Sequence, residues 1–258
     1  MKKLRAGERQ TQILELLSRN GSMKVTELAD YFQVSRETIR RDLTVLHQKG
    51  SIRKWFGGAL PNSEKNEYDI QAISERPSPH SAEKMQICRK ALSLLPPQAT
   101  IFLDNGSTIL YLARYLSQMS GYTIITPSIA CVSICASSSN KIIVCPGAVD
   151  PLTVSATGSY AADFLNLLRT DFAFLCCSGF RSNDGPTSND LDYSQVKAAA
   201  LKNTQTSIVL SDSSKAGYSS LLPFAKWEEI DYLITDSGLD QEIYQSISSR
   251  TQVIFADR

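Results

Sequence analysis

The stretch VSRETIRRDLTVLHQ, residues 34–48, is the most informative part of this 258-residue sequence. It predicts a helix that begins after Ser35, a preferred N-cap residue, and carries Glu37 in the first turn, where the helix dipole favours a carboxylate. Aliphatic side chains at i, i+4 and i+7 form one stripe that we expect to be buried, namely Ile39, Leu43 and Leu46. At about 100° per residue, the opposite face holds Glu37, Arg41, Thr44 and Gln48, flanked by Thr38 and Arg40.

Two further helical patterns precede this helix. Residues 8–19 repeat leucine and isoleucine at helical spacing and end at the turn residues Asn20-Gly21-Ser22. Another pattern follows a short extended piece, with Thr26 as its expected cap and a break at Gln33-Val34. Two short helices joined by a tight turn, the second with an arginine-rich outer face, predict a helix-turn-helix.

The residues after this helix predict a basic wing. Lys49-Gly50 ends the helix, and SIRKWFGG, residues 51–58, alternates in character before a Gly-Gly turn. Alternation of apolar and polar residues before a glycine turn is typical of a small β-hairpin, whose edge would carry Arg53 and Lys54. The N-terminal part is therefore expected to be a small α+β winged helix-turn-helix.

The net charge of the chain is +1, and the charge is unevenly distributed. Residues 1–60 contain 12 Lys/Arg and 6 Asp/Glu, a balance of +6. The whole chain contains 27 and 26, so the remaining residues contain 15 basic and 20 acidic side chains, a balance of −5. A basic module joined to an acidic body suggests an anionic partner for the module, and nucleic acid is the natural candidate.

The predicted winged helix-turn-helix supplies the chemistry that recognition of double-stranded DNA needs. Arginine donates two hydrogen bonds to guanine, Glu37 can accept one from cytosine, and hydroxyl groups and helix N-termini hold phosphates. The alternative, a solvated charged face on an ordinary three-helix bundle, explains neither the wing nor the charge balance. The candidate DNA-contacting residues are Thr26, Ser35, Arg36, Glu37, Thr38, Arg40, Arg41, Thr44, Arg53 and Lys54.

The segment that follows has the composition of a linker. Residues 61–81 contain three prolines, two asparagines and four serines, together with many charges and no clear periodicity. We therefore expect a DNA-binding domain at residues 1–60, a linker at residues 61–76 and a second domain at residues 77–258.

The second domain alternates short apolar runs with amphipathic stretches, which predicts an α/β domain with a largely parallel sheet covered on both faces. A helix is expected from Ala82 to the Pro96-Pro97 pair. The expected strands are residues 100–104, 122–126, 141–145, 172–177, 207–212, 231–235 and 252–255. The other expected helices are residues 107–118, 128–137, 158–168, 190–203 and 240–248.

Small polar and charged residues collect where the expected strands end. Ligands of parallel sheets bind at the carboxyl ends of the strands, near the point where the strand order reverses. Glycine and hydroxyl groups at a strand-to-helix turn suit a phosphate, and a lysine adds charge. The candidate effector-binding residues are Asp104, Asn105, Gly106, Ser107, Thr108, Thr126, Ser128, Gly147, Ala148, Gly179, Lys197, Asp212 and Lys215. Together they predict a site for a small polar anion, and a sugar phosphate fits.

The N-terminal sequence carries a motif set found in a known family. VSRETIRRDL at residues 34–43, then Gly50 and Arg53, then Gly57-Gly58-Ala59 resemble the signature of the DeoR family of bacterial transcriptional regulators. Trp55-Phe56 departs from the family, which commonly has His or Tyr before the glycine pair. We expect this departure to change the packing of the wing rather than its function.

The second domain resembles the sensor domain of the same family over nearly its full length. The matching pieces are Asp104–Thr108, Thr126–Ser128, Gly147-Ala148, Gly179, Lys197, Asp212–Lys215 and Ile234–Asp236. Members of the family generally repress catabolic operons and release DNA when a phosphorylated sugar binds, and their sensor fold resembles ribose-5-phosphate isomerase. The resemblance therefore implies a repressor of a carbohydrate operon with a sugar-phosphate effector.

Three of the matching pieces depart from the family pattern. Ser107-Thr108 is a mild change, Thr126-Pro127-Ser128 replaces Thr-Asn-Ser, and Gly147-Ala148 replaces Gly-Gly. Pro127 removes an amide side chain and a backbone N–H. We expect Pro127 and Ala148 to reshape the pocket and so to affect which ligand binds.

Two other functions remain open from the sequence. An active sugar-phosphate isomerase needs a carboxylate that abstracts a proton beside the carbonyl. Residues 177–182, CSGFRS, stand where the isomerases carry an acidic cluster, and the next carboxylate is Asp184. We therefore expect a protein that is not an enzyme. The other alternative is a DNA-binding protein whose second domain only oligomerises.

The remaining residue types indicate the setting of the protein. The six cysteines form no C-x-x-C pair and only His47 and His80 are present, so we expect reduced structural thiols, no metal site and no cofactor. The N-terminus lacks an apolar signal region, and no apolar run approaches the roughly 18 residues of a membrane span. We expect a cytoplasmic homo-oligomer, a dimer or tetramer, because helix-turn-helix proteins usually read paired half-sites.

Overall fold

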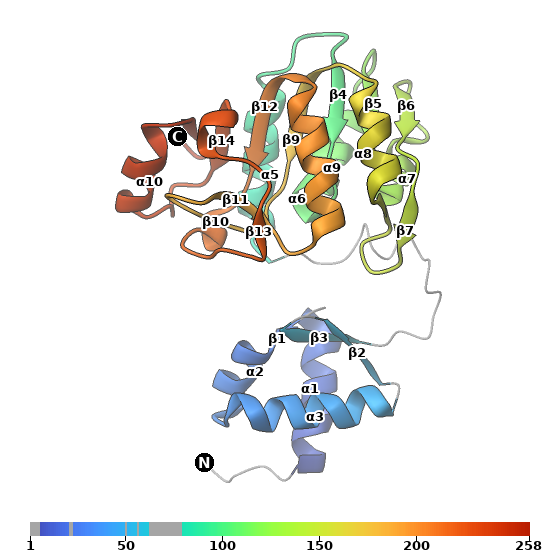
Figure 1. The fold of residues 1–258 in the computed structure, drawn as a ribbon. Coiled ribbons are helices and arrows are strands. Elements are labelled where there is room, and N and C mark those ends of the chain that lie inside the picture. The colour runs from blue at the N-terminus through green and yellow to red at the C-terminus, as the bar shows by residue number, and fades with distance from the viewer. Residues whose placement is uncertain (1–5, 21–22, 50, 56, 62–78) are drawn as a thin grey trace. The chain divides into compact units, whose positions relative to one another are not determined.

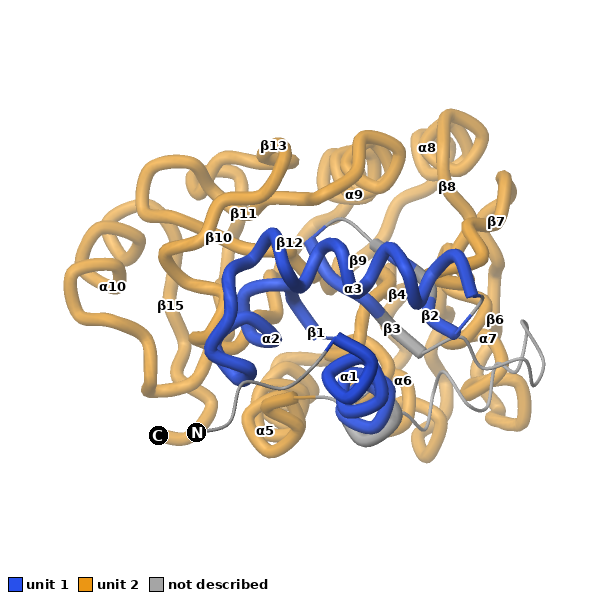
Figure 2. Tube along the Cα trace, turned by 90° about the horizontal axis from the view of Figure 1, so that it is seen from below, with its two compact units in different colours: residues 1–69 blue, residues 70–258 orange. Residues whose placement is uncertain are grey.

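The computed structural model of the protein describes residues 6–20, 23–49, 51–55, 57–61 and 79–258. The chain divides into two compact units, residues 1–69 (unit 1) and residues 70–258 (unit 2), which Figure 2 shows in different colours. Each unit has its own hydrophobic core. None of the helices in the described part of the chain is long and apolar enough to span a bilayer.

The described part of unit 1 combines helices with a three-stranded antiparallel sheet (Figure 1). Its elements are α1 (Ala6–Asn20), β1 (Met23–Lys24), α2 (Val25–Phe32), α3 (Arg36–Gln48), β2 (Ile52–Trp55) and β3 (Gly58–Pro61). The strand order is β1-β3-β2, so β2 and β3 form the predicted wing. The aliphatic stripe of α3 is buried as expected and shares a core with Ile13 and Leu17 of α1.

The turn between α2 and α3 forms as the sequence predicts. Gln33 ends α2 in the left-handed conformation, with φ 53°. Ser35 then caps α3, because its hydroxyl accepts a hydrogen bond from the backbone N–H of Thr38 at 3.2 Å.

The start of α2 differs from the prediction. Thr26 is not the cap, because α2 begins at Val25 and Thr26 lies inside it. Lys24 still pairs with Gly58 in the sheet, so the helix starts directly after the strand. The N-cap residue is Lys24, whose backbone N–H donates to the Glu27 carboxylate at 2.8 Å.

Unit 2 is built on a seven-stranded parallel sheet with the strand order β15-β14-β12-β9-β4-β5-β6. The strands are β4 (Thr100–Leu103), β5 (Thr123–Thr126), β6 (Lys141–Val144), β9 (Thr170–Leu175), β12 (Thr204–Leu210), β14 (Tyr232–Thr235) and β15 (Gln252–Phe255). Each corresponds to one of the apolar runs that predicted a strand. Buried strands of this kind read as continuous apolar runs, which is why the pattern was informative.

Helices cover both faces of this sheet (Figure 1). They are α5 (Ser81–Leu92), α6 (Ser107–Ser117), α7 (Ile129–Cys135), α8 (Ser159–Asn166), α9 (Leu191–Lys202) and α10 (Gln241–Ser248). Helices α5, α6 and α7 contribute Ile87, Leu112 and Cys131 to one core cluster. Helices α8, α9 and α10 contribute to the other, so the two clusters lie on opposite faces of the sheet.

Several small elements escaped sequence analysis. They are β7 (Ala148–Asp150), β8 (Ser155–Thr157), β10 (Gly179–Arg181), β11 (Gly185–Ser188), β13 (Leu222–Pro223) and the 3-10 turns η1 (Ser213–Lys215) and η2 (Trp227–Glu229). β7 pairs with β8, and β10, β11 and β13 form a second small sheet. These strands are two to four residues long, so they show no measurable hydrophobic period.

The strand order reverses between β4 and β9. The chain adds β5 and β6 on one side of β4, and then places β9, β12, β14 and β15 on the other side. In sheets of this type, ligands bind beyond the carboxyl ends of the strands at such a reversal. The residues that follow β4 and β9 are therefore expected to contribute to a ligand-binding site.

Candidate functional site

A buried ion pair lies at the carboxyl ends of β4 and β9. Asp104 directly follows β4, and one of its carboxylate oxygens accepts a hydrogen bond from the backbone N–H of Cys176 at 2.8 Å. The same oxygen pairs with the Lys197 ammonium, which also donates to the Cys176 carbonyl at 3.0 Å. Asp104 and Lys197, 93 residues apart in sequence, therefore meet where the topology predicts.

A second charged group follows β12, the strand beside β9. Asp212 is buried and accepts a hydrogen bond from the Ser214 hydroxyl. Its backbone carbonyl accepts the N–H of Lys215, whose side chain is partly exposed. From the end of β14, Asp236 accepts both the backbone N–H and the hydroxyl of Ser213 at 2.7 Å. This turn is thus fixed from two strand ends.

Lys84 of α5 belongs to the same region, and sequence analysis missed it. Only 6% of its surface is exposed, and its ammonium donates to the Pro79 carbonyl at 2.7 Å. Burial lowers the pKa of Lys84, the positive charge of Lys215 acts in the same direction, and the carboxylate of Asp212 opposes them. Lys84 therefore lies within electrostatic range of Asp212 and Lys215.

The thiols beside these charges remain protonated near neutral pH. Burial raises the pKa of Cys176 to about 12, and Asp104 adds to the effect. Burial also raises the pKa of Cys177 to about 11, although Lys197 and Lys215 both act to lower it. The Cys177 thiol also donates to the Ser211 hydroxyl at 3.5 Å, and Lys197 donates to the neighbouring Cys176 carbonyl, so the Asp104–Lys197 pair and the group around Asp212 border one region. We call Lys84, Asp104, Lys197, Asp212 and Lys215 the charged cluster.

Other predicted effector residues have local structural roles. Thr126 accepts the backbone N–H of Ser128 at 3.1 Å, and Ser128 caps α7 by accepting the N–H of Cys131 at 3.3 Å. A side chain on Gly147 would meet the Thr157 carbonyl oxygen at 2.6 Å, and one on Gly179 would meet the Tyr218 carbonyl oxygen at 2.5 Å. Close backbone approach therefore explains both glycines.

The remaining predicted residues follow the carboxyl ends of β4 and β6. Asn105 and Gly106 connect β4 to α6, Ser107 and Thr108 begin α6, and Ala148 begins β7. Gly106 precedes α6 with φ 137°, a conformation that favours glycine. The Thr108 carbonyl accepts a hydrogen bond from the Cys88 thiol at 3.2 Å, which ties this turn to α5.

In unit 1, the predicted DNA-reading face of α3 is exposed and charged. The side chains of Arg40 and Arg41 are 66% and 82% exposed, and Glu37 lies 3.6 Å and 3.9 Å from them. Arg36 is also exposed. The hydroxyl groups of Thr38 and Ser35 are hydrogen-bonded to each other at 2.9 Å. Exposed arginines on one helix face are what contact with base edges requires.

The wing is tied to this helix. The Lys54 ammonium donates to the Thr44 hydroxyl at 2.5 Å, and that hydroxyl donates to the Arg40 carbonyl at 2.7 Å. In the free protein Thr44 thus connects α3 to β2. Arg53 lies in β2, but the structure does not describe its side chain, so its predicted DNA contact stays a prediction.

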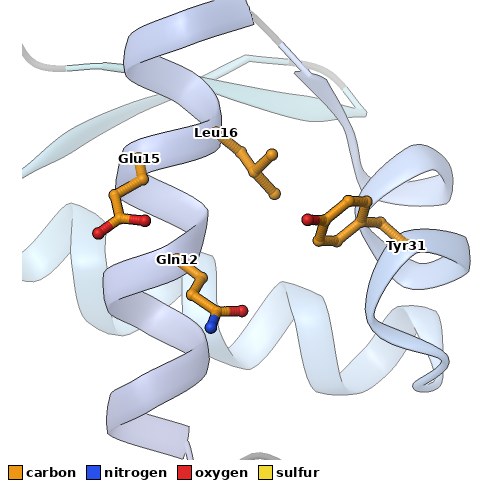
Figure 3. Close-up of a pocket in the computed structure, with 4 residues that line it drawn as sticks. All are labelled: Gln12, Glu15, Leu16 and Tyr31. Atoms are coloured by element: carbon orange, nitrogen blue, oxygen red, sulfur yellow. The ribbon is translucent and has the colours of Figure 1, made fainter.

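Unit 1 also has a shallow hollow of about 190 Å³ between α1 and α2. Gln12, Glu15 and Leu16 of α1 line it together with Tyr31 of α2. Figure 3 shows the Tyr31 ring and the Leu16 side chain approaching each other across the gap. None of these residues belongs to α3 or the wing, so the hollow is separate from the predicted DNA-reading face.

Comparison with known proteins identifies both units. Residues 9–65 match the DeoR-like helix-turn-helix domain, and residues 79–237 match the DeoR C-terminal sensor domain. The chain belongs to the DeoR family. It is a helix-turn-helix transcriptional regulator of that family, as its sequence motifs predict.

Similar members of the DeoR family are named as regulators. The transcriptional regulator GolR of Listeria innocua is 30% identical over 92% of this chain and 93% of its own length. The glycerol-3-phosphate regulon repressor of Escherichia coli is 28% identical, with 93% and 95% covered. The lactose phosphotransferase system repressor of Staphylococcus epidermidis is 29% identical, with 96% and 98% covered.

Solved structures give a more distant similarity. A D-ribose-5-phosphate isomerase in complex with phospho-erythronic acid is 16% identical, with a TM-score of 0.39 and 52% of each chain covered.

Proposed function

We propose that this DeoR-family regulator represses a carbohydrate operon and leaves its operator when a phosphorylated sugar binds at the charged cluster of unit 2. The observation that carries the effector proposal is the composition of that cluster. It brings three lysines and two aspartates together from α5, α9, η1 and the ends of β4 and β12. Lysines outnumber aspartates among these five side chains, and the Asp236 carboxylate lies beside them, bonded to Ser213.

The three lysines of the cluster suit an anionic ligand. Lys84 and Lys197 are both buried and held by hydrogen bonds to the Pro79 and Cys176 carbonyls, so a bound anion would meet ammonium groups that the protein already holds in place. A phosphate monoester carries about −1.5 to −2 charges near neutral pH, and lysine is a common phosphate ligand. The polar strand-end turns beside the cluster offer hydroxyl and amide groups for a sugar.

The names of the relatives support an operon of carbohydrate metabolism. One is named a glycerol-3-phosphate regulon repressor and another a lactose phosphotransferase system repressor. One name contains a phosphorylated compound and the other a phosphotransferase system, which agrees with an anion-binding cluster.

The side-chain contacts support binding without catalysis. A catalytic base must be within hydrogen-bonding reach of the proton that it removes. The carboxylate of Asp104 is engaged by Lys197 and the Cys176 backbone, and the carboxylate of Asp212 by Ser214. We therefore propose a sensor in which both aspartates hold lysines or turns in place.

The DNA-binding role belongs to α3 and the wing in this proposal. Arg40 and Arg41 would read base edges, while Lys54 and Arg53 would contact phosphates. A dimer or tetramer would present two such units to paired half-sites. Light scattering of the full-length protein tests this oligomeric state.

Operator release by defined sugar phosphates tests the proposal. Full-length protein is bound to an operator duplex obtained by in vitro selection, and fluorescence anisotropy follows its release by a panel of sugar phosphates. We expect at least one sugar phosphate to release DNA, whereas the matching free sugar and inorganic phosphate do not. Release by free sugars alone, or turnover of the sugar phosphate during the assay, would overturn the proposal.

A further inference from the structure

A buried ion pair joins α1 to the predicted DNA-reading helix of unit 1. The Arg9 Nε atom lies 2.5 Å from Asp42 Oδ2, and the side chains are 9% and 5% exposed. The amide of Gln10 donates to Asp42 Oδ1 at 3.1 Å. Both oxygens of the Asp42 carboxylate are thus engaged by consecutive residues of α1.

Asp42 directly follows the two arginines that are proposed to read DNA. Arg41 is 82% exposed, whereas the Asp42 side chain is 5% exposed. Since successive helix residues are about 100° apart, α3 passes from its outer face to its inner face within this one step. A rotation of α3 that displaced Asp42 would displace Arg41 by the same angle.

The aliphatic contacts of α3 do not fix this angle by themselves. Ile39, Leu43 and Leu46 pack against α1, but hydrophobic contact is non-directional and depends mainly on buried area. Ridges-into-grooves packing allows more than one class of helix crossing angle, with a scatter of about 15–20° within each class. A hydrogen-bonded ion pair has directional geometry and is costly to break when buried.

We infer that the Arg9–Asp42 ion pair is a positioning device, which sets the rotation of α3 against α1 and so places Arg40 and Arg41 for base recognition. Buried ion pairs often add little net stability compared with apolar residues of similar size. The pair is therefore expected to matter for selectivity between DNA sequences more than for folding. The inference rests on the proposed base-reading role of Arg41.

A double variant separates positioning from stability. In the full-length protein, Arg9→Met with Asp42→Leu replaces the pair by apolar side chains and removes both charges together. We expect its melting temperature to equal or exceed that of the wild type. We expect its preference for the selected operator over an unrelated duplex to fall by about tenfold, the value of one base contact.

Two matched variants keep the test decisive. Leu17→Ala leaves a cavity in the same core and lowers stability without touching the pair, so it should keep the wild-type preference at temperatures well below its melting point. Asp42→Asn preserves the shape of the side chain and removes its charge, so it should lose preference even if the double variant does not fold.

The outcomes distinguish the positioning role of the Arg9–Asp42 pair from the proposed base-reading role of Arg41. Wild-type preference in the double variant, or in Asp42→Asn, would overturn the positioning role. Equal loss of preference in Leu17→Ala would show that any weakening of the core has the same effect, which would also overturn it. If Arg41→Ala keeps full preference, the base-reading role has failed instead.

Discussion

Lys215→Ala is expected to uncouple the effector from DNA release. Lys215 lies in η1 with a partly exposed side chain, and its backbone N–H, which the substitution keeps, donates to Asp212. The fold should therefore tolerate the change. A charge-assisted hydrogen bond to phosphate contributes about 1.5–3 kcal/mol, and partial exposure places Lys215 near the lower end of that range. A loss of about 1.4 kcal/mol corresponds to a tenfold change in affinity.

The assay is operator release measured as a function of effector concentration. A ligand releases DNA only to the extent that it prefers the non-operator conformation, so weaker binding shifts the whole curve. Operator affinity without effector should stay near the wild-type value, and the inducing concentration should rise at least about tenfold. Lys141→Ala is the matched control, because Lys141 is exposed at the amino end of β6, away from the carboxyl ends. Release by Lys215→Ala at the wild-type concentration would refute the reasoning.

Three other predictions concern the DNA contacts, the unit boundary and Lys84. Arg41→Ala should cost about 1–3 kcal/mol of specific binding and relax the preference at one base pair, and an equal loss for specific and non-specific DNA would contradict this prediction. Arg53→Ala should weaken binding to all DNA sequences alike and flatten the dependence of log affinity on log salt concentration by about one unit. A fragment of residues 77–258 should unfold cooperatively, bind the effector and ignore DNA in anisotropy, and a molten fragment would place the boundary elsewhere. Lys84→Met should reduce effector sensitivity. Because folding lowers the pKa of Lys84, stability should rise with pH toward its ordinary value of 10.5, and calorimetry should show a flatter dependence in Lys84→Met.

The sequence was sufficient for the main sheet because burial on both faces leaves a strong signal. Each central strand is a run of consecutive apolar residues, such as Ile101–Leu103 in β4. The start of α3 was equally predictable, because serine is a preferred N-cap residue and Ser35 directly precedes the apolar stripe of the helix. By contrast, Thr26 was misplaced because the β1 pairing, which is a tertiary contact, decides where α2 begins.

The charged cluster was predicted in part, for a topological reason. Asp104, Lys197, Asp212 and Lys215 all lie near strand ends at one edge, and sequence analysis could place them together. Lys84 comes from α5, which precedes the described strands of the unit in the sequence, so Lys84 follows no strand end. The sequence did carry a sign of its burial, because Lys84 lies on the same face of α5 as Ile87 and Ala91. A search for apolar residues at helical spacing does not register a lysine at such a position. The roles of Gly147 and Gly179 depend on distant backbone atoms and left no local pattern.

The strand order of unit 2 has a consequence for how the protein is made. During translation β4, β5 and β6 are synthesised before β9. The edge of β4 that pairs with β9 therefore stays unpaired until residues 170–175 have left the ribosome. Exposed strand edges invite pairing with other chains, and non-local contacts form slowly. Asp104 lies at the end of that waiting edge, and its partner Lys197 is synthesised still later. The ion pair thus joins an early and a late half of the chain, and the proposed effector site is complete only after both halves have been synthesised and have packed together.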